Sequence, residues 1–70
     1  MVGIDHYSIG GAKEPGNGNT HTILLSKPVL IVEDLSFPAE VFGLAQPVEF
    51  MALPIHFRAF SGSFCRPVLL

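Results

Sequence analysis

Basic residues, cysteines and long apolar segments are all scarce in this chain. Its four lysines and arginines, within a net charge of −2, are too few and scattered to follow a phosphate backbone, which argues against nucleic-acid binding. The single cysteine, Cys65, excludes an internal disulfide and favours a reducing compartment. Prolines and charges interrupt every apolar stretch well before the ~20 residues that a membrane helix needs. The N-terminus shows no pattern of a signal peptide. We therefore expect a cytoplasmic protein with no membrane span.

Hydrophobic side chains, by contrast, are abundant. Of the 70 residues, 49% are hydrophobic and only 14% are charged. A chain of this length forms at most a single domain, and it buries only about 60% of the surface that it exposes when unfolded. Because few polar side chains are available to cover the outside, we expect a large exposed apolar face. Such a face would contact another copy of the chain or a missing part of the same protein.

The N-terminal half of the chain predicts a strand, a loop and a short helix. Residues 2–9 begin with a short apolar run and predict a strand. The stretch 10–19 is rich in glycine and asparagine and predicts a flexible loop. Thr20 is the expected N-cap of a short helix over 21–26, which ends before Pro28.

The rest of the chain predicts strands with little helix between them. The β-branched and apolar run 29–32 is typical of a strand buried on both faces. The segment 36–46 predicts a connection with at most one helical turn, around Ala39. Strands are expected over 48–57 and 66–70, and Pro54 places its part of the strand at a sheet edge or a bulge. This order indicates a mixed α/β domain dominated by sheet.

Two residues, one on each side of the region 29–32, have the chemistry of metal ligands. His21 precedes it and Glu33 follows it directly. Imidazole and carboxylate are ligands that zinc and manganese accept. An unpaired anion at the end of a buried strand is costly, so Glu33 needs a partner. A divalent metal is one interpretation; the other is that Glu33 faces solvent or pairs with Lys27 while His21 is an ordinary surface residue. The pair by itself leaves both open.

Other polar residues are weaker candidates for chemistry. His6 would be a third ligand only if the loop carried it to His21 and Glu33, and neither strand alternation nor a flexible loop imposes that geometry. Cys65 has no histidine at a defined distance, so the pattern does not support a nucleophile. Asp5 is expected to cap the loop through hydrogen bonds, His56 to be a satisfied or exposed histidine on its strand, and Arg66 to be an ion-pair partner in the core or at an interface.

A larger pattern surrounds the pair. In chain order it consists of Val-Gly-Ile-Asp at 2–5 with Ser8 after it, His21 followed by two leucines, Pro-Val-Leu-Ile-Val-Glu-Asp-Leu at 28–35, Phe-Met-Ala-Leu-Pro-Ile at 50–55, and Gly62-Ser63 with Arg66. In order and spacing these elements resemble the C-terminal part of the cyclase family. That family is the group of metal-dependent hydrolases that contains bacterial kynurenine formamidase.

The resemblance implies a fold, a site and a class of reaction. Residues 1–70 would be the sheet-dominated C-terminal part of a cyclase-like, swivelling β/β/α domain with one or two short helices. His21 would ligate a divalent metal, zinc or manganese, and Glu33 would bridge two metals or complete the site. Such metals polarise a carbonyl and activate water. The implied reaction is hydrolysis of an amide or lactam C–N bond, with N-formylkynurenine to kynurenine and formate, in tryptophan catabolism, as the leading family activity.

The chain departs from this family in one large respect. The remaining ligands of the family lie in an N-terminal motif, His-x-Gly-Thr-His-x-Asp, which is followed by a catalytic histidine, and residues 1–70 contain no match to it. We therefore expect the chain to supply part of a metal site. Its expected partners are a small amide or lactam substrate and either further copies of the chain, in a homo-oligomer, or a missing N-terminal segment. The alternative is a non-catalytic, truncated module that associates through its apolar sheet.

Overall fold

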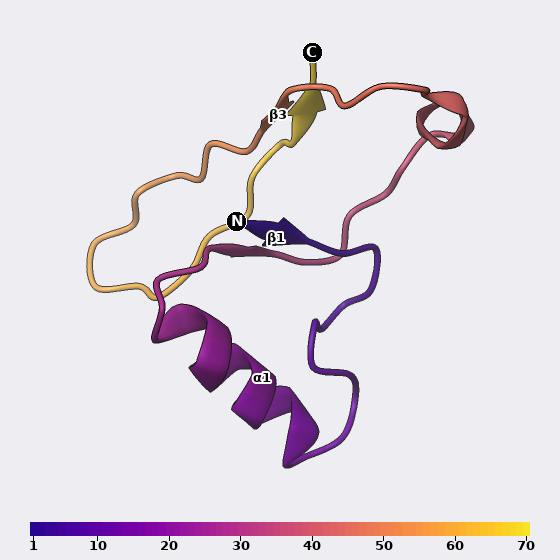
Figure 1. Cartoon of the computed structure of the whole chain (residues 1–70). Helices are drawn as coiled ribbons and strands as arrows, with labels where there is room; N and C mark the ends of the chain where they lie inside the picture. The colour runs from indigo at the N-terminus through magenta and orange to yellow at the C-terminus, as the bar shows by residue number, and fades with distance from the viewer. The chain divides into compact units, whose positions relative to one another are not determined.

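The computed structural model describes residues 1–70 and divides them into two compact units, Met1–Ala39 and Glu40–Leu70. In the first unit, strand β1 (Val2–Gly3) pairs in parallel with strand β2 (Ile31–Val32), with the first residues of the two strands opposite each other. Helix α1 (Gly16–Leu25) lies between them in the chain (Figure 1). Parallel strands need such a crossover connection, usually a helix.

Backbone hydrogen bonds extend the contact between the two strands beyond their ends. The Leu35 N–H donates to the Ile4 carbonyl at 3.0 Å, and the Asp34 N–H donates to the His6 carbonyl at 2.8 Å. Asp34 has a φ of 58°, in the left-handed region that aspartate tolerates better than most residues. Glu33 is therefore held between β2 and a turn, beside the loop that follows β1.

Helix α1 begins earlier than the sequence predicts, so the prediction of Thr20 as its N-cap is wrong. Pro15 occupies the N-cap position without a side-chain cap. Glu14 Oε2 instead accepts the Gly18 N–H at 3.0 Å and satisfies an amide of the first turn. The Thr20 hydroxyl donates to the Gly16 carbonyl at 2.9 Å. The last four residues of the predicted loop are consequently helical, despite their glycine and asparagine content.

Substitution of Gly18, in the interior of α1, tests whether helix propensity or the bond from the Gly18 amide to Glu14 has the larger effect on stability. We expect Gly18→Ala to raise the free energy of unfolding by up to about 1 kcal/mol, because glycine is disfavoured in helices by that amount relative to alanine. The added Cβ would lie 3.0 Å from Glu14 Oε2, at the end of a flexible side chain. Urea denaturation followed by far-UV circular dichroism measures the change. Destabilisation would show that the bond from Glu14 to the Gly18 amide outweighs helix propensity.

The second unit contains one antiparallel strand pair. Strand β3 (Phe50–Met51) pairs with β4 (Val68–Leu69), and an isolated bridge joins Pro54 to Cys65. The predicted strands 48–57 and 66–70 are thus reduced to two residues each. Pro54, which cannot donate to a ladder, forms only the isolated bridge. The helical turn predicted around Ala39 is confirmed as the 3-10 helix η1 (Ala39–Gly43).

The mixed α/β character is confirmed, with one α-helix and two small sheets. The sheets are smaller than predicted, since every strand has two residues while α1 has ten. The expectation that 29–32 is buried on both faces is wrong, because Ile31 and Val32 are only half-buried. A strand is buried on both faces only where other layers cover it. No helix in the structure has both the length and the apolar character to cross a membrane.

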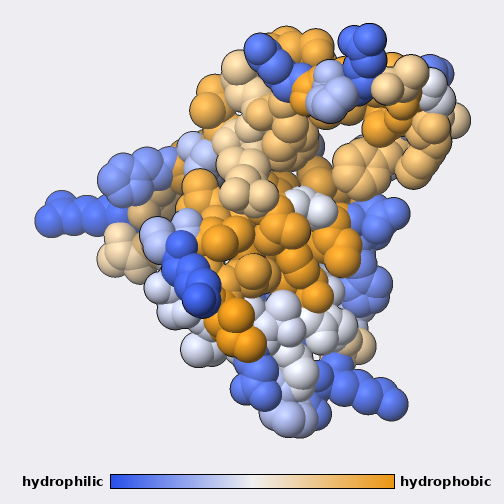
Figure 2. Space-filling model, in the orientation of Figure 1, coloured by the Kyte–Doolittle hydropathy of each residue, from blue (hydrophilic) through white to orange (hydrophobic).

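The chain has no buried hydrophobic residue, and Ser8, 6% exposed, is its only buried residue. Hydrophobic residues are visible over much of the face drawn in Figure 2. The expectation of extensive exposed apolar surface is therefore confirmed. The most exposed large hydrophobic side chains are Phe42 at 76%, Phe60 at 75%, Phe64 at 73% and Leu53 at 71%.

Candidate metal centre

His21 and Glu33, twelve residues apart in the sequence, meet in the first unit. His21 lies in the second half of α1, and Glu33 directly follows β2. Their side chains approach to 2.9 Å between Nε2 and Oε1, and they are 30% and 28% exposed. The chain leaves α1, forms β2 and so places Glu33, just after β2, beside His21 of the helix. The contact is partly screened from solvent but accessible.

The orientation of the His21 ring is set by its own helix. Nδ1 lies 2.8 Å from the Asn17 carbonyl oxygen, one turn earlier in α1. A carbonyl oxygen can only accept, so Nδ1 carries the proton and donates, and Nε2 faces Glu33. Metal-ligating histidines commonly show this arrangement, with the second ring nitrogen donating to a carbonyl or carboxylate.

Glu33 is held from two sides. Its Oε1 accepts the Ile9 N–H at 2.8 Å and contacts His21 Nε2 at 2.9 Å. The interpretation in which Glu33 pairs with Lys27 is thus not what the structure shows, because the ionic partner of the carboxylate is His21. Glu33 stands half-exposed with two partners, rather than as an unpaired anion in a buried strand.

Both ring contacts affect the protonation of His21. Its pKa is raised above the ordinary value, first by the hydrogen bond to the Asn17 carbonyl, with desolvation opposing, and then by Glu33 and the charge of Glu14. When His21 is protonated, both ring nitrogens donate. When it loses that proton, the Nε2 lone pair faces a carboxylate oxygen, an unfavourable contact that a cation placed between the two would relieve.

We expect the stability of the metal-free protein to depend on the protonation of His21. Because its folded-state pKa is raised, its contribution is fully present below the unfolded value of about 6.5 and is lost as the pH rises through the folded value. Urea denaturation across this pH range, with a chelator present, measures the decline. His21→Gln should remove this component, whereas His56→Gln should retain it. An unchanged pH profile in His21→Gln would contradict the assignment.

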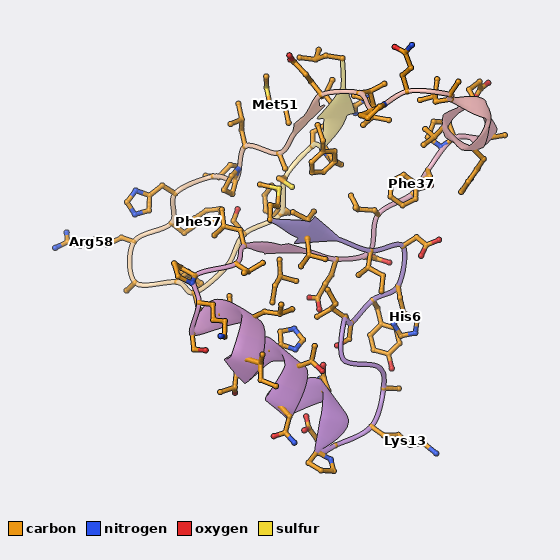
Figure 3. All side chains as sticks on the ribbon, in the orientation of Figure 1. His6, Lys13, Phe37, Met51, Phe57 and Arg58 are labelled. Atoms are coloured by element: carbon orange, nitrogen blue, oxygen red, sulfur yellow. The ribbon has the colours of Figure 1, made fainter.

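The chemistry of the donors fits zinc or manganese, but their number fits only part of a site. Zinc is held by three or four protein ligands, and no group of three His, Cys, Asp or Glu side chains in this chain is arranged to hold a metal. His6 is therefore not a third ligand. It lies on the loop after β1 (Figure 3), where its Nδ1 is 3.1 Å from the Ser8 nitrogen and its ring stacks on Tyr7.

The remaining residues considered make other contacts than those of His21 and Glu33. Cys65 forms the bridge with Pro54 in the second unit, and it is a free cysteine. His56 and Arg66 also belong to that unit. Arg58, between β3 and β4, projects outward from its segment in Figure 3. Neither Cys65 nor His56 joins His21 and Glu33 in a ligand cluster.

Two groups that position His21 and Glu33 were missed in the sequence. The Ile9 N–H and the Asn17 carbonyl are backbone groups, so the identity of those residues does not reveal their role. Ser8 is part of the family-like pattern, but its burial becomes visible only in the folded chain. Comparisons with protein-family models, with characterised proteins and with solved structures found no match.

Proposed function

We propose that His21 and Glu33 hold a divalent cation, zinc or manganese, in the metal centre of a hydrolase that cleaves an amide or lactam C–N bond. The observation that carries the proposal is the 2.9 Å approach of Nε2 to Oε1, with Nδ1 donating to the Asn17 carbonyl. The resemblance to the cyclase family supports the substrate class. An N-formyl aryl amine, as in N-formylkynurenine, would be hydrolysed to formate and the free amine.

The distance between the two donors is compatible with a cation after a small adjustment. Ligands at about 2.0–2.1 Å from zinc with tetrahedral angles lie about 3.3 Å apart. The observed 2.9 Å therefore has to widen by a few tenths of an ångström. Both side chains are about a third exposed, so side-chain rotation is enough.

His21 and Glu33, and the two backbone groups that hold them, have separate roles at this metal centre. His21 supplies a neutral nitrogen, which the Asn17 carbonyl keeps directed at the cation. Glu33 supplies negative charge, and the Ile9 N–H keeps its Oε1 in place. His21 and Glu33 would hold the divalent cation, which would supply polarisation of the carbonyl of the scissile bond. The further donors come from a second copy of the chain or from another segment, such as one that carries the His-x-Gly-Thr-His-x-Asp motif.

The test is a Zn²⁺ titration of the full chain, followed by NMR of the histidine rings, alone and with a segment that carries this motif. We expect the His21 ring signals to shift in a saturable manner and the His56 signals to remain unchanged. N-formylkynurenine hydrolysis is assayed on the same samples. Failure of Zn²⁺ to shift the His21 signals in either sample rejects the metal centre. Metal binding without hydrolysis in either sample rejects the hydrolase assignment.

The second candidate function is a non-catalytic module that associates through its apolar surface. The absence of buried hydrophobic residues, with all four residues of β3 and β4 exposed, favours it. Sedimentation velocity of the chain and of the double variant His21→Ala/Glu33→Ala discriminates between the two functions. If association survives in the double variant and metal binding is also unchanged, the enzymatic interpretation of the pair is wrong.

A further inference from the structure

The only buried residue of this chain is polar. Ser8 is 6% exposed, and its hydroxyl donates to Asn17 Oδ1 in the first turn of α1. Buried polar groups are generally hydrogen-bonded, and this one makes its bond to a different element, nine residues further along the chain. The contact therefore attaches the loop after β1 to the helix that carries His21.

A neighbouring residue makes a second contact at the same point of the helix. A Cβ added to Gly10 would lie 2.5 Å from Asn17 Cα and 2.8 Å from the Asn17 carbonyl oxygen. Glycine thus allows the backbone of the loop to approach the backbone of α1 closely. The carbonyl that orients His21 belongs to the same residue, Asn17.

Ile9, between these two contacts, forms a hydrogen bond to the other proposed ligand, Glu33. Ile9, flanked by Ser8 and Gly10, donates its N–H to Glu33 Oε1 at 2.8 Å. Three consecutive residues therefore connect the helix of one ligand to the carboxylate of the other. If the loop moved away from Asn17, the Ile9 amide would move away from Glu33.

We propose that Ser8 is a positioning residue of the metal centre, and this inference rests on the proposed function of His21 and Glu33. By attaching the loop to Asn17, the Ser8 hydroxyl keeps the Ile9 amide on Glu33 and so keeps the carboxylate facing His21 Nε2. Ser8 itself contacts neither the cation nor the substrate. Its effect on metal binding passes through Ile9.

The test compares Zn²⁺ affinity of the full chain and of Ser8→Ala by calorimetry. We expect an affinity about 10-fold lower in the variant, within the 10–100-fold range for loss of a group behind a metal ligand. Ser26→Ala is the matched control, because it deletes a hydroxyl that donates only to the Ile23 carbonyl near the end of α1. In the metal-free protein, hydrogen exchange of the Ile9 amide should accelerate in Ser8→Ala and not in Ser26→Ala.

Asn17→Ala removes the same contact from the side of the helix. It replaces Ser8→Ala in the test if that variant fails to fold, because alanine is favoured in helices. This variant should lose the same affinity, and the double variant should lose no more than either single variant. Equal Zn²⁺ affinity of the unaltered chain and both single variants overturns the inference alone, as do additive losses in the double variant. Failure of the unaltered chain to bind Zn²⁺ overturns the inference together with the proposed function.

Discussion

Glu33→Gln lowers the affinity of the chain for Zn²⁺ by more than about 100-fold, since losing a group behind a ligand already costs about 10–100-fold. The substitution removes the negative charge of one of the two donors. It retains an oxygen that can accept the Ile9 N–H, so the loop keeps its contact. The loss therefore reports on ligation rather than on unfolding. Calorimetric titration measures it, at a pH above the folded pKa of His21, where Zn²⁺ does not compete with a proton.

Glu40→Gln is the matched control for this substitution. Glu40 lies in η1, in the second unit, and its loss changes the net charge of the chain by the same amount. We expect its Zn²⁺ affinity to stay within about twofold of the unaltered chain, because an exposed charge that ligates no metal acts only through solvent, where salt screens it. If both variants bind Zn²⁺ equally well, Glu33 is not a ligand. His21→Ala and His56→Ala repeat the comparison for the nitrogen donor.

Gly10→Ala lowers the free energy of unfolding of the first unit by about 3 kcal/mol or more, at the upper end of the cost of overpacking. The new Cβ would lie 2.5 Å from Asn17 Cα, and the atoms that it meets are backbone atoms that cannot rotate away. Either the loop or the start of α1 has to shift. With no buried hydrophobic residue to offset the change, we expect the cooperative transition of this unit to be lost. Urea denaturation monitored by helix circular dichroism measures the effect.

Gly62→Ala controls for the loss of a glycine as such. A Cβ at Gly62 has no atom within 4 Å, and its backbone does not require a positive φ. We expect a change of less than about 0.5 kcal/mol, as for most surface substitutions. Equal stability of the two variants would contradict the close approach of Gly10 to Asn17. Hydrogen exchange at Ile9 in Gly10→Ala then shows whether the bond to Glu33 is lost with that approach.

One local feature was predicted correctly, because the turn around Ala39 is helical. The strand predicted over 48–57 was not, since only Phe50–Met51 and the isolated bridge at Pro54 pair with another segment. The N-terminus of α1 was predicted wrongly because Glu14 and Pro15 start the helix within a glycine-rich stretch. Weak intrinsic propensities of this kind are overridden once side chains satisfy the first-turn amides. The strands are shorter than their apolar runs because a hydrophobic run does not itself supply a partner strand.

For the candidate site, the sequence yielded the two side chains but not their setting. His21 and Glu33 are recognisable because imidazole and carboxylate are metal-ligand types and because their spacing is part of a family-like pattern. Their 2.9 Å approach depends on the path from α1 into β2. The position of Glu33 depends on the Ile9 amide, a group that every residue except proline possesses. Sequence patterns carry no information on which amide will be used.

By itself, the sequence determined the chemical composition of this protein: two candidate ligands, few charges, and more hydrophobic side chains than 70 residues can bury. These properties follow from residue identity and chain length, whatever the fold. Only the tertiary structure decided that Glu33 pairs with His21 rather than with Lys27, and that Ser8 and Ile9 connect the loop to Asn17 and Glu33. Such pairings arise from backbone groups and from residues distant in the chain, which are brought together only when the helix and strands fold.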